Sequence, residues 1–584
     1  MSIENGLQQV VDFMQFINTM QVQKRSHEFE SKLINKYENM MLSPYFARMD
    51  FKEDGKEKAE KVYIGISNLI NEDFDFLVYD WRAPISSMFY DFEIGSSFYN
   101  CPEGIIKGEI LKKRQYKISN SKIDYMFDSS IKIDDEVLQD ILSKSSDNKM
   151  KAIVTTIQRD QNKAIRNEKD KNLIVQGPAG SGKTSVALHR IAYLLYKHRD
   201  IITAKNIVIF SPNNIFNDYI SNVLPQLGED NMLQTTFREY MHNVLHDIRG
   251  KEDYCEMMEN IFGNKNDPSY NIRSESLKFK SSSDFLKLLK LYIKELDKIA
   301  MTFGDITILG KTIISSDEIQ ELFYKDYKSI PFKRKLEKLN KRILYLIEAA
   351  KENIINKKSK ELENTDESLH KDEILKLSKD LVANEIKNIV KDFEEKTTFD
   401  LLEAYKKFYN DIEKLLNISK IKYDRKSIEE IKNYTLENLQ AKKINYEDQI
   451  ALLFIKGAVG DIPNTDEIKY LIIDEAQDYS PLQYEIFNQL FNKANKTILG
   501  DLSQSINPYM NVGSYNNLLE IFEPDSTSII NLTKSYRSTV EITEFSRRIL
   551  GNKIKDEYVS RRGEQPRVTG FSDEKEINEK KLKK

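Results

Sequence analysis

The chain has 584 residues, too many for one hydrophobic core, and this length predicts about three to five domains. Its 88 lysines and arginines are nearly balanced by 92 aspartates and glutamates, so no overall positive field marks a nucleic-acid binder. A narrow channel with locally basic side chains would still be enough to bind a nucleic-acid strand. Two distant cysteines, Cys101 and Cys255, suggest neither a disulfide framework nor a zinc site. Met1–Lys24 has no leader pattern and no run of about 18 apolar residues occurs, so we expect a cytoplasmic protein without a membrane partner.

The first 150 residues divide into a segment predicted to be helical and a segment predicted to be rich in β-strands. Residues 1–43 predict a helical arm, since proline is absent and no glycine follows Gly6. Residues 44–150 predict a β-rich lead-in region with short strands at 45–51, 61–66, 76–80 and 109–117. The single tryptophan, Trp81, is better explained as a core anchor than as a binding platform.

Residues 151–240 alternate between strand-like and helix-like runs. The expected order is a strand at 173–175, a helix at 186–196, a strand at 206–210 and a helix at 214–224. This alternation predicts a parallel sheet covered by helices. The same alternation of strand-like and helix-like runs occurs over 451–526, with buried strands expected at 470–473 and 496–500.

Residues 241–450 interrupt this pattern with a long helical insertion rich in lysine and glutamate. Apolar residues recur at helical spacing in two runs: Leu336, Leu339, Ile343 and Leu346, then Val382, Ile386, Ile389 and Phe393. A polar stretch at 356–371 lies between them and reads as a solvated link. Two amphipathic helices joined in this way predict a hairpin or short coiled coil, although the charged residues also fit an ordinary solvated face.

One short run fits G-x-x-x-x-G-K-[ST], between an expected strand and an expected helix. Its eight residues are Gly177, Pro178, Ala179, Gly180, Ser181, Gly182, Lys183 and Thr184. Glycines let the backbone wrap a polyphosphate, the lysine reaches the β- and γ-phosphates, and the threonine hydroxyl serves Mg²⁺. A glycine-rich turn could match by chance, but the strand and helix around it favour a nucleotide site that also includes Ser185. We expect ATP and Mg²⁺ as cofactors.

Two adjacent carboxylates, Asp474 and Glu475, follow the apolar run 471–473. The carboxyl end of a strand is where ligands lie in an open α/β sheet. Asp474 is placed to hold Mg²⁺, and Glu475 is placed to accept a proton from the water that attacks the γ-phosphate. Acids after a strand can also simply cap the next helix. Pairing with a phosphate loop favours the catalytic interpretation.

Three further segments are weak signals alone. Gln504 follows an expected strand and offers an amide that could sense a γ-phosphate, and Tyr536 and Arg537 offer an aromatic ring and a guanidinium. Upstream, Gln158 and Gln161 precede the first strand, and a glutamine can bind adenine through two hydrogen bonds.

Together and in this order, these segments resemble the superfamily 1 helicases of the UvrD/Rep type. The resemblance implies a RecA-like motor domain with helices on both faces of a parallel sheet. Gln161 lies 16 residues before Gly177, the spacing that family uses, and is therefore preferred to Gln158 as the adenine reader. By the same resemblance, Tyr536 would stack on the base and Arg537 would reach the γ-phosphate as an arginine finger.

The segments 44–51, 79–85 and 154–159 resemble a narrower branch, called helicase IV or HelD-like. Its best-known members bind bacterial RNA polymerase and release it from stalled complexes. That branch carries a helical N-terminal arm and a large insertion in the first motor domain, as expected here. The resemblance implies RNA polymerase core as a partner, together with DNA or RNA–DNA complexes.

Three departures from the wider family stand out. Phe210–Asn214 replaces its strand-gripping segment, and Asn507–Met510 replaces the aromatic and arginine that would contact bases. Tyr509 could still stack with a base, but a core or turn role fits equally well. The chain ends at Lys584, before counterparts of the family's two last motifs, so we expect residues 527–584 to begin a second RecA-like domain that stays incomplete.

Three functions remain open from the sequence. The first is an ATP-dependent, HelD-like motor that acts on RNA polymerase. The second is a 3′–5′ single-strand DNA translocase or helicase in DNA repair. The third is a partner-binding protein that binds ATP but turns it over weakly.

Overall fold

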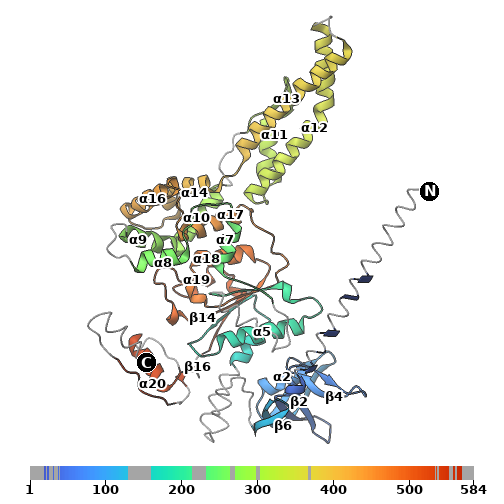
Figure 1. Cartoon of the computed structure of the whole chain (residues 1–584), viewed down its shortest axis with the longest axis vertical. Coiled ribbons are helices and arrows are strands. Elements are labelled where there is room, and N and C mark those ends of the chain that lie inside the picture. The colour runs from blue at the N-terminus through green and yellow to red at the C-terminus, as the bar shows by residue number, and fades with distance from the viewer. Residues whose placement is uncertain are drawn as a thin grey trace, which may run out of the picture.

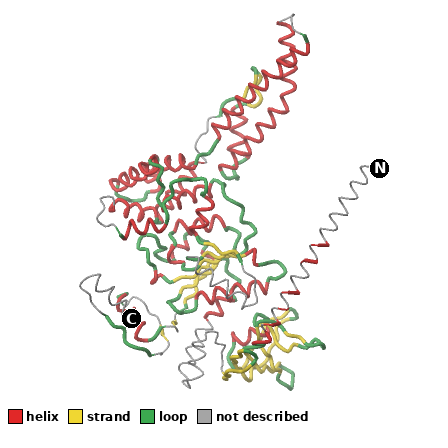
Figure 2. The backbone as a smooth tube through the Cα atoms, in the orientation of Figure 1, coloured by secondary structure: helices red, strands yellow, loops and turns green. Residues whose placement is uncertain are grey.

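The computed structural model describes residues 40–128, 160–212, 232–263, 270–296, 303–365, 370–532, 538–551 and 562–568, with single residues or pairs between 19 and 38 and at 534–535 and 557–558. Strands gather in two main groups (Figure 2). One is an N-terminal sheet, and the other is a central sheet, here called the motor sheet because it contains the strands of the expected motor domain. Helices form the region beyond the motor sheet, and a long helical pair projects from it (Figure 1).

The N-terminal sheet has seven strands and one packed helix. Its elements are β1 (Ala47–Glu53), β2 (Glu60–Gly65), β3 (Leu69–Ile70), β4 (Phe76–Asp80), α2 (Pro84–Asp91), β5 (Gly95–Cys101), β6 (Gly104–Ser119) and β7 (Lys122–Asp128). The four strands expected from the sequence correspond to β1, β2, β4 and β6. Trp81 is buried, which confirms the expectation of a core anchor.

A buried lysine holds the end of α2 in place. Lys113, only 1% exposed, extends from β6 and donates hydrogen bonds to the carbonyl oxygens of Phe89 (2.9 Å) and Phe92. These carbonyls lie at the helix end, where no intrahelical donor is available. Desolvation of the ammonium group lowers the pKa of Lys113 to about 7.

The motor sheet contains six parallel strands in the order β10-β9-β13-β14-β8-β15. Their bounds are β8 (Asn172–Gln176), β9 (Ile207–Phe210), β10 (Leu233–Thr235), β13 (Tyr470–Ile473), β14 (Asn495–Gly500) and β15 (Thr527–Asn531). Every expected strand of this domain is present. The helix expected at 214–224 lies outside the described residues.

The motor sheet separates two hydrophobic cores, because successive side chains of a strand point to opposite faces. Leu173 and Val175 of β8 pack with α5 (Lys183–Lys197) and with residues of the N-terminal sheet. Ile174, between them, belongs to the core on the other face. That core includes α7 (Phe237–Val244), α10 (Ser283–Leu296), α17 (Tyr446–Ala458) and α18 (Pro481–Leu490).

The insertion supplies the rest of the helical region. Its remaining elements are α8 (Tyr254–Phe262), α9 (Tyr270–Lys280), β11 (Ile306–Ile308), β12 (Lys311–Ile314), α11 (Ser316–Glu321), α12 (Phe332–Thr365), α13 (Lys371–Thr397), α14 (Leu401–Asn410), α15 (Ile412–Ser419) and α16 (Arg425–Gln440). Helices α12 and α13 pack side by side and project away from the motor sheet (Figure 1). Leu336, Leu339, Ile343, Val382 and Phe393 are buried between elements of this part, as the helical spacing predicts.

The sequence placed several boundaries incorrectly. The solvated link was expected to begin at 356, but α12 continues to Thr365 because lysine and glutamate propagate a helix well. The second RecA-like domain was expected to begin at 527, yet β15 pairs with β8 and is the edge strand of the first sheet. The boundaries at 240 and 450 fall inside α7 and α17.

After β15, the described residues include α20 (Val540–Ile549) and the short strands β16 (Lys534–Ser535) and β17 (Glu557–Tyr558), which pair in parallel. Among the described helices, none combines the length and the apolar character needed to cross a bilayer.

The pKa of Lys113 predicts a specific pH dependence. In the folded protein the amine loses its proton near pH 7, whereas an unfolded chain keeps it to about pH 10.4. The unfolded state therefore binds more protons between these values, and stability rises with pH across this window. We expect the urea midpoint of the wild type, followed by the fluorescence of Trp81, to rise between pH 6.5 and 9 relative to Lys113→Met. Parallel pH profiles for the two proteins would contradict this assignment.

Candidate nucleotide-binding site

The glycine-rich loop joins β8 to α5 at the carboxyl edge of the motor sheet. Gly180 and Gly182 have φ angles of 75° and 84°, in the left-handed region that glycine enters at little cost. Gly177 is tightly enclosed, since a Cβ there would lie 2.4 Å from Ser181 Oγ and 2.9 Å from Leu532 Cβ. The loop therefore needs glycine at these positions to bring its backbone around a ligand.

The start of α5 offers groups that suit an anion. Lys183 Nζ donates to the carbonyl oxygens of Gly177 (2.7 Å) and Pro178 (3.3 Å), so its ammonium lies inside the loop. Ser181 Oγ is buried and has no hydrogen-bond partner among the described residues. With the free N–H groups of a helix start, this set is typical of a phosphate site.

Two carboxylates lie opposite the loop. Asp474, 3% exposed, follows β13, and its Oδ2 accepts a hydrogen bond from Thr184 Oγ1 at 3.3 Å. Desolvation, reinforced by the neighbouring Glu475 charge, raises the pKa of Asp474 to about 6. Glu475 has a φ of 48°, an uncommon conformation for a residue with a side chain, and such strain is concentrated at functional sites.

A chain of hydrogen bonds links Glu475 to Gln504. Gln477 Nε2 donates to Glu475 Oε2 at 2.7 Å, and Gln477 Oε1 accepts from the backbone N–H of Asp501 at 2.9 Å. The carboxylate of Asp501 then accepts from Gln504 Nε2 at 2.5 Å. Gln477 and Asp501 are buried, whereas Gln504 is exposed at the site's edge. These hydrogen bonds connect the expected base, Glu475, to the expected sensor, Gln504.

Gln161 lies on a helical turn at 160–165 beside the loop. Its Nε2 donates to the carbonyl oxygen of Ser181 at 2.8 Å, which places the side chain next to the start of α5. Ser185, in the first turn of α5, is exposed and bonds with His189 instead. Gln158, Tyr536 and Arg537 lie outside the described residues.

Three residues that hold this site together were not predicted from the sequence. They are Gln477, Asp501 and Arg190. The buried Arg190 guanidinium donates to the carbonyl oxygens of Ala164 (2.8 Å) and Ile165 (3.2 Å) and to Thr497 Oγ1 (3.0 Å), joining the Gln161 helix to α5 and the sheet. Gln477 lies two residues after Glu475, and Asp501 lies three residues before Gln504, so closeness in sequence to these predicted residues was the available signal. For Arg190, burial was the missing information.

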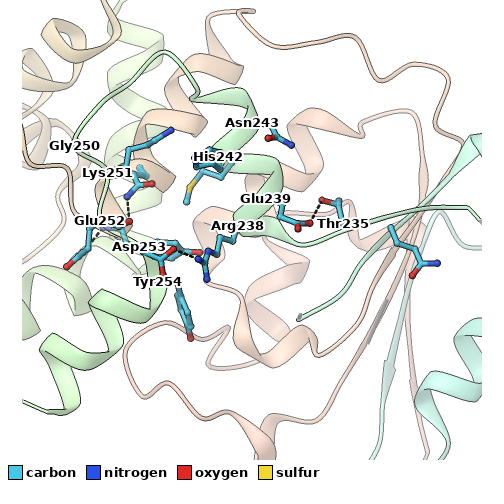
Figure 3. A pocket seen from close by; sticks show the side chains of 14 residues that line it. Thr235, Arg238, Glu239, His242, Asn243, Gly250, Lys251, Glu252, Asp253 and Tyr254 are labelled. Carbon is cyan, nitrogen blue, oxygen red and sulfur yellow. Dashed lines mark hydrogen bonds and ion pairs between the residues drawn. The ribbon is translucent and has the colours of Figure 1, made fainter. Parts of the chain in front are cut away.

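The site opens toward the helical insertion through two neighbouring cavities. One of about 460 Å³ is lined by Glu475, Asp478, Pro212 and Arg238, among other residues. The second, of about 910 Å³, shares Arg238 with it and extends along α7 (Figure 3). Its polar side chains are largely paired with each other, since Arg238 contacts Asp253 and Glu239 accepts from Thr235.

The donor set suits a magnesium ion bound with a nucleotide. Thr184 Oγ1 and the Asp474 carboxylate are oxygen ligands of the kind Mg²⁺ prefers. Burial and the neighbouring Glu475 charge raise the pKa of Asp474, and a bound cation would favour its charged form. In the described part of the chain, no group of three or more His, Cys, Asp or Glu side chains forms a metal site. Mg²⁺ demands octahedral oxygen coordination, so an ion bound to Thr184 and Asp474 would take its other ligands from nucleotide phosphates and water.

Comparison with known proteins decides the family. Residues 157–521, more than half of the chain, match the family described as UvrD/REP helicase N-terminal domain. The chain belongs to the UvrD/REP helicase family. Residues 5–144 match the family described as DNA helicase IV HelD, N-terminal domain, which places this member in the HelD branch. The motor sheet is thus the RecA-like domain of a superfamily 1 helicase, carrying a helical insertion.

Individual relatives are distant. The chain is 28% identical over 188 residues to the ATP-dependent DNA helicase Rep of Buchnera aphidicola subsp. Acyrthosiphon pisum (strain APS), a match covering 32% of this chain and 29% of that protein. It is 27% identical over 127 residues to the ATP-dependent DNA helicase Rep of Buchnera aphidicola subsp. Schizaphis graminum (strain Sg), covering 21% and 19% respectively. The chain thus spans less than a third of the length of either relative.

The hydrogen bonds of Gln477 predict a defect in turnover rather than binding. Gln477→Leu removes both of its bonds, leaving Glu475 unoriented and the buried Asp501 N–H unpaired. We expect kcat for ATP to fall roughly 10- to 100-fold, because hydrogen bonds to charged groups contribute about 1.5–3 kcal/mol, while KM changes little.

The matched control is Gln449→Leu, which removes a buried amide in α17 that donates to the Glu252 carbonyl at 2.7 Å. This change should leave ATP turnover near the wild-type value. Equal losses in the two variants, measured by phosphate release, would show that Gln477 acts only through general stability.

Proposed function

We propose that this chain is an ATP-driven motor that hydrolyses ATP with Mg²⁺ and uses domain movement to remodel RNA polymerase complexes. The observation that carries the ATPase part is the contact between Thr184 of the phosphate loop and the buried Asp474 of β13, 3.3 Å apart. Two segments 290 residues apart in sequence meet there with the groups that a magnesium nucleotide needs.

Each side chain has a defined role in this proposal. Lys183 binds the β- and γ-phosphates. Thr184 and Asp474 would hold Mg²⁺, which would neutralise charge on those phosphates when bound. Glu475 takes a proton from water as the water oxygen bonds to the γ-phosphorus and the bond to the ADP oxygen breaks. Gln504 senses the γ-phosphate, and Gln161 reads the adenine. Roles for Tyr536 (base stacking) and Arg537 (arginine finger) rest on the sequence resemblance.

RNA polymerase core is favoured as the partner by two features. The first is the match of residues 5–144 to the HelD N-terminal domain. The second is the charge of the cavities beside the site: their lining has more acidic than basic side chains, including Glu239, Glu252, Asp253 and Asp478. Acidic walls oppose a phosphate backbone. Because such a partner lies in the bacterial cytoplasm, we propose the same location for this chain.

A DNA translocase is the second candidate. It is favoured by the likeness to proteins named ATP-dependent DNA helicase Rep. In that case DNA would be the polymer that moves past the nucleotide site. A protein that binds ATP but turns it over weakly is the third.

Phosphate release by the purified chain separates these functions. Stimulation by RNA polymerase core, unaffected by nuclease, supports the proposed function. Stimulation by single-stranded DNA without polymerase supports the translocase. Binding of ATP with negligible release under both conditions supports the third function and contradicts the first two.

The role of Glu475 gives a direct prediction. Glu475→Gln should lower kcat about 100-fold or more, since general base catalysis contributes on that scale, while ATP binding persists. The control is Glu485→Gln in α18, a carboxylate that pairs with Lys290 at 2.7 Å, and it should keep wild-type turnover. Retained turnover in Glu475→Gln would assign the base elsewhere.

A further inference from the structure

The N-terminal domain contacts the motor domain on the outer side of the nucleotide site. Trp81 lies against the His189 ring of α5, with ring centroids 5.5 Å apart, and the Arg82 guanidinium lies over the Tyr196 ring at 4.7 Å. Both motor residues belong to the helix that follows the phosphate loop. Trp81 and core residues of α5 share one buried cluster, so the two domains are packed together rather than loosely joined.

A polar network at this contact reaches the Gln161 helix. Asn162 Nδ2 donates to the Asp91 carboxylate at the end of α2, and Arg166 Nε donates to Asn162 Oδ1 at 3.2 Å. Arg166 also donates to the carbonyl oxygen of Trp81 at 3.4 Å. Asp91, Asn162 and Arg166, here called the Asp91 network, therefore tie the N-terminal domain to this helix.

Gln161 and Asn162 are neighbours on one helical turn, but their side chains form hydrogen bonds with two different domains. Gln161 donates to the carbonyl oxygen of Ser181 in the phosphate loop, while Asn162 donates to Asp91 of the N-terminal domain. On the motor side the helix end is held by Arg190. The N-terminal domain thus provides the second anchor, next to the residue expected to read the base.

We propose that the N-terminal domain sets the nucleotide preference of the motor, with Asp91 acting through Asn162 to position Gln161 for adenine. This inference rests on the proposed role of Gln161 in reading the base. The expected phosphate ligands, Lys183 and the loop backbone, lie outside the Asp91 network. Loss of the network should therefore weaken ATP binding specifically, because guanine lacks the donor and acceptor pattern that a glutamine reads on adenine.

The test is equilibrium binding of Mg-ATP and Mg-GTP to the full chain. In Asp91→Ala we expect affinity for ATP to fall about 5- to 10-fold, as for the loss of one buried hydrogen bond, with GTP binding unchanged. Asp91→Asn keeps an acceptor for Asn162 and should retain most of the ATP preference. Adding Gln161→Ala to Asp91→Ala should cause little further loss, since both act through one contact.

Control variants distinguish a wrong role for Gln161 in reading adenine from a wrong role for Asp91 in positioning it. Asp50→Ala breaks a carboxylate–guanidinium pair with Arg48 in the same domain, away from the motor contact, and should change neither affinity. If Gln161→Ala alone leaves ATP binding unchanged, the adenine-reading role is wrong. If Gln161→Ala weakens ATP binding but Asp91→Ala does not, or if Asp91→Ala weakens ATP and GTP equally, the positioning role is overturned.

A second variant tests the proposal even if Asp91→Ala misfolds the N-terminal domain. Asn162→Ala cuts the same contact from the motor side and leaves α2 intact, so Trp81 fluorescence should keep its folded signal. It should reproduce the selective loss of ATP affinity. An unchanged ratio of ATP to GTP affinity in this variant would also overturn the proposal.

Discussion

The parallel register of the motor sheet is the constraint on which the site depends. Ile473 of β13 pairs with Ile498 of β14, and Gly500 pairs with Gln176 of β8. Parallel strands end at a common edge, so the segments that follow them emerge side by side although they are hundreds of residues apart in sequence. The phosphate loop, the two carboxylates and the Gln504 turn each follow a strand that ends at this edge, so they lie close together.

At this edge, the carboxylate of Asp474 is buried, so a bound cation would stabilise its charged form. Asp474 is removed from water beside a second carboxylate, and its pKa is raised accordingly. The Lys183 ammonium lies inside the phosphate loop, where its Nζ donates to the carbonyl oxygen of Gly177. A magnesium nucleotide would supply the cation to Asp474 and the anion to Lys183 together. The insertion leaves this arrangement intact because α7 and α17 pack as one core with the sheet face.

The sequence predicted β8, β9, β13, β14 and the loop residues because each has a strong local signal, such as the apolar run before Asp474, whereas it predicted neither β10 nor β15 as part of this sheet. It failed where pairing is non-local. Nothing in Thr527–Asn531 indicates that β15 joins the first sheet. The end of α12 was misplaced for a local reason, because its last residues are polar and yet are good helix formers. The Gln477 and Asp91 contacts were equally hidden, since each joins residues whose proximity only the fold creates. The expected roles of Tyr536 and Arg537 stay predictions.

The most direct test of this account is calorimetric titration of the purified chain with Mg-ATP, beside Lys183→Ala. The account predicts one ATP bound per chain, and a 10- to 100-fold weaker affinity in the variant, on the order of one charge-assisted hydrogen bond. Wild-type binding by Lys183→Ala, or no saturable binding by either protein, would contradict a nucleotide site at the phosphate loop.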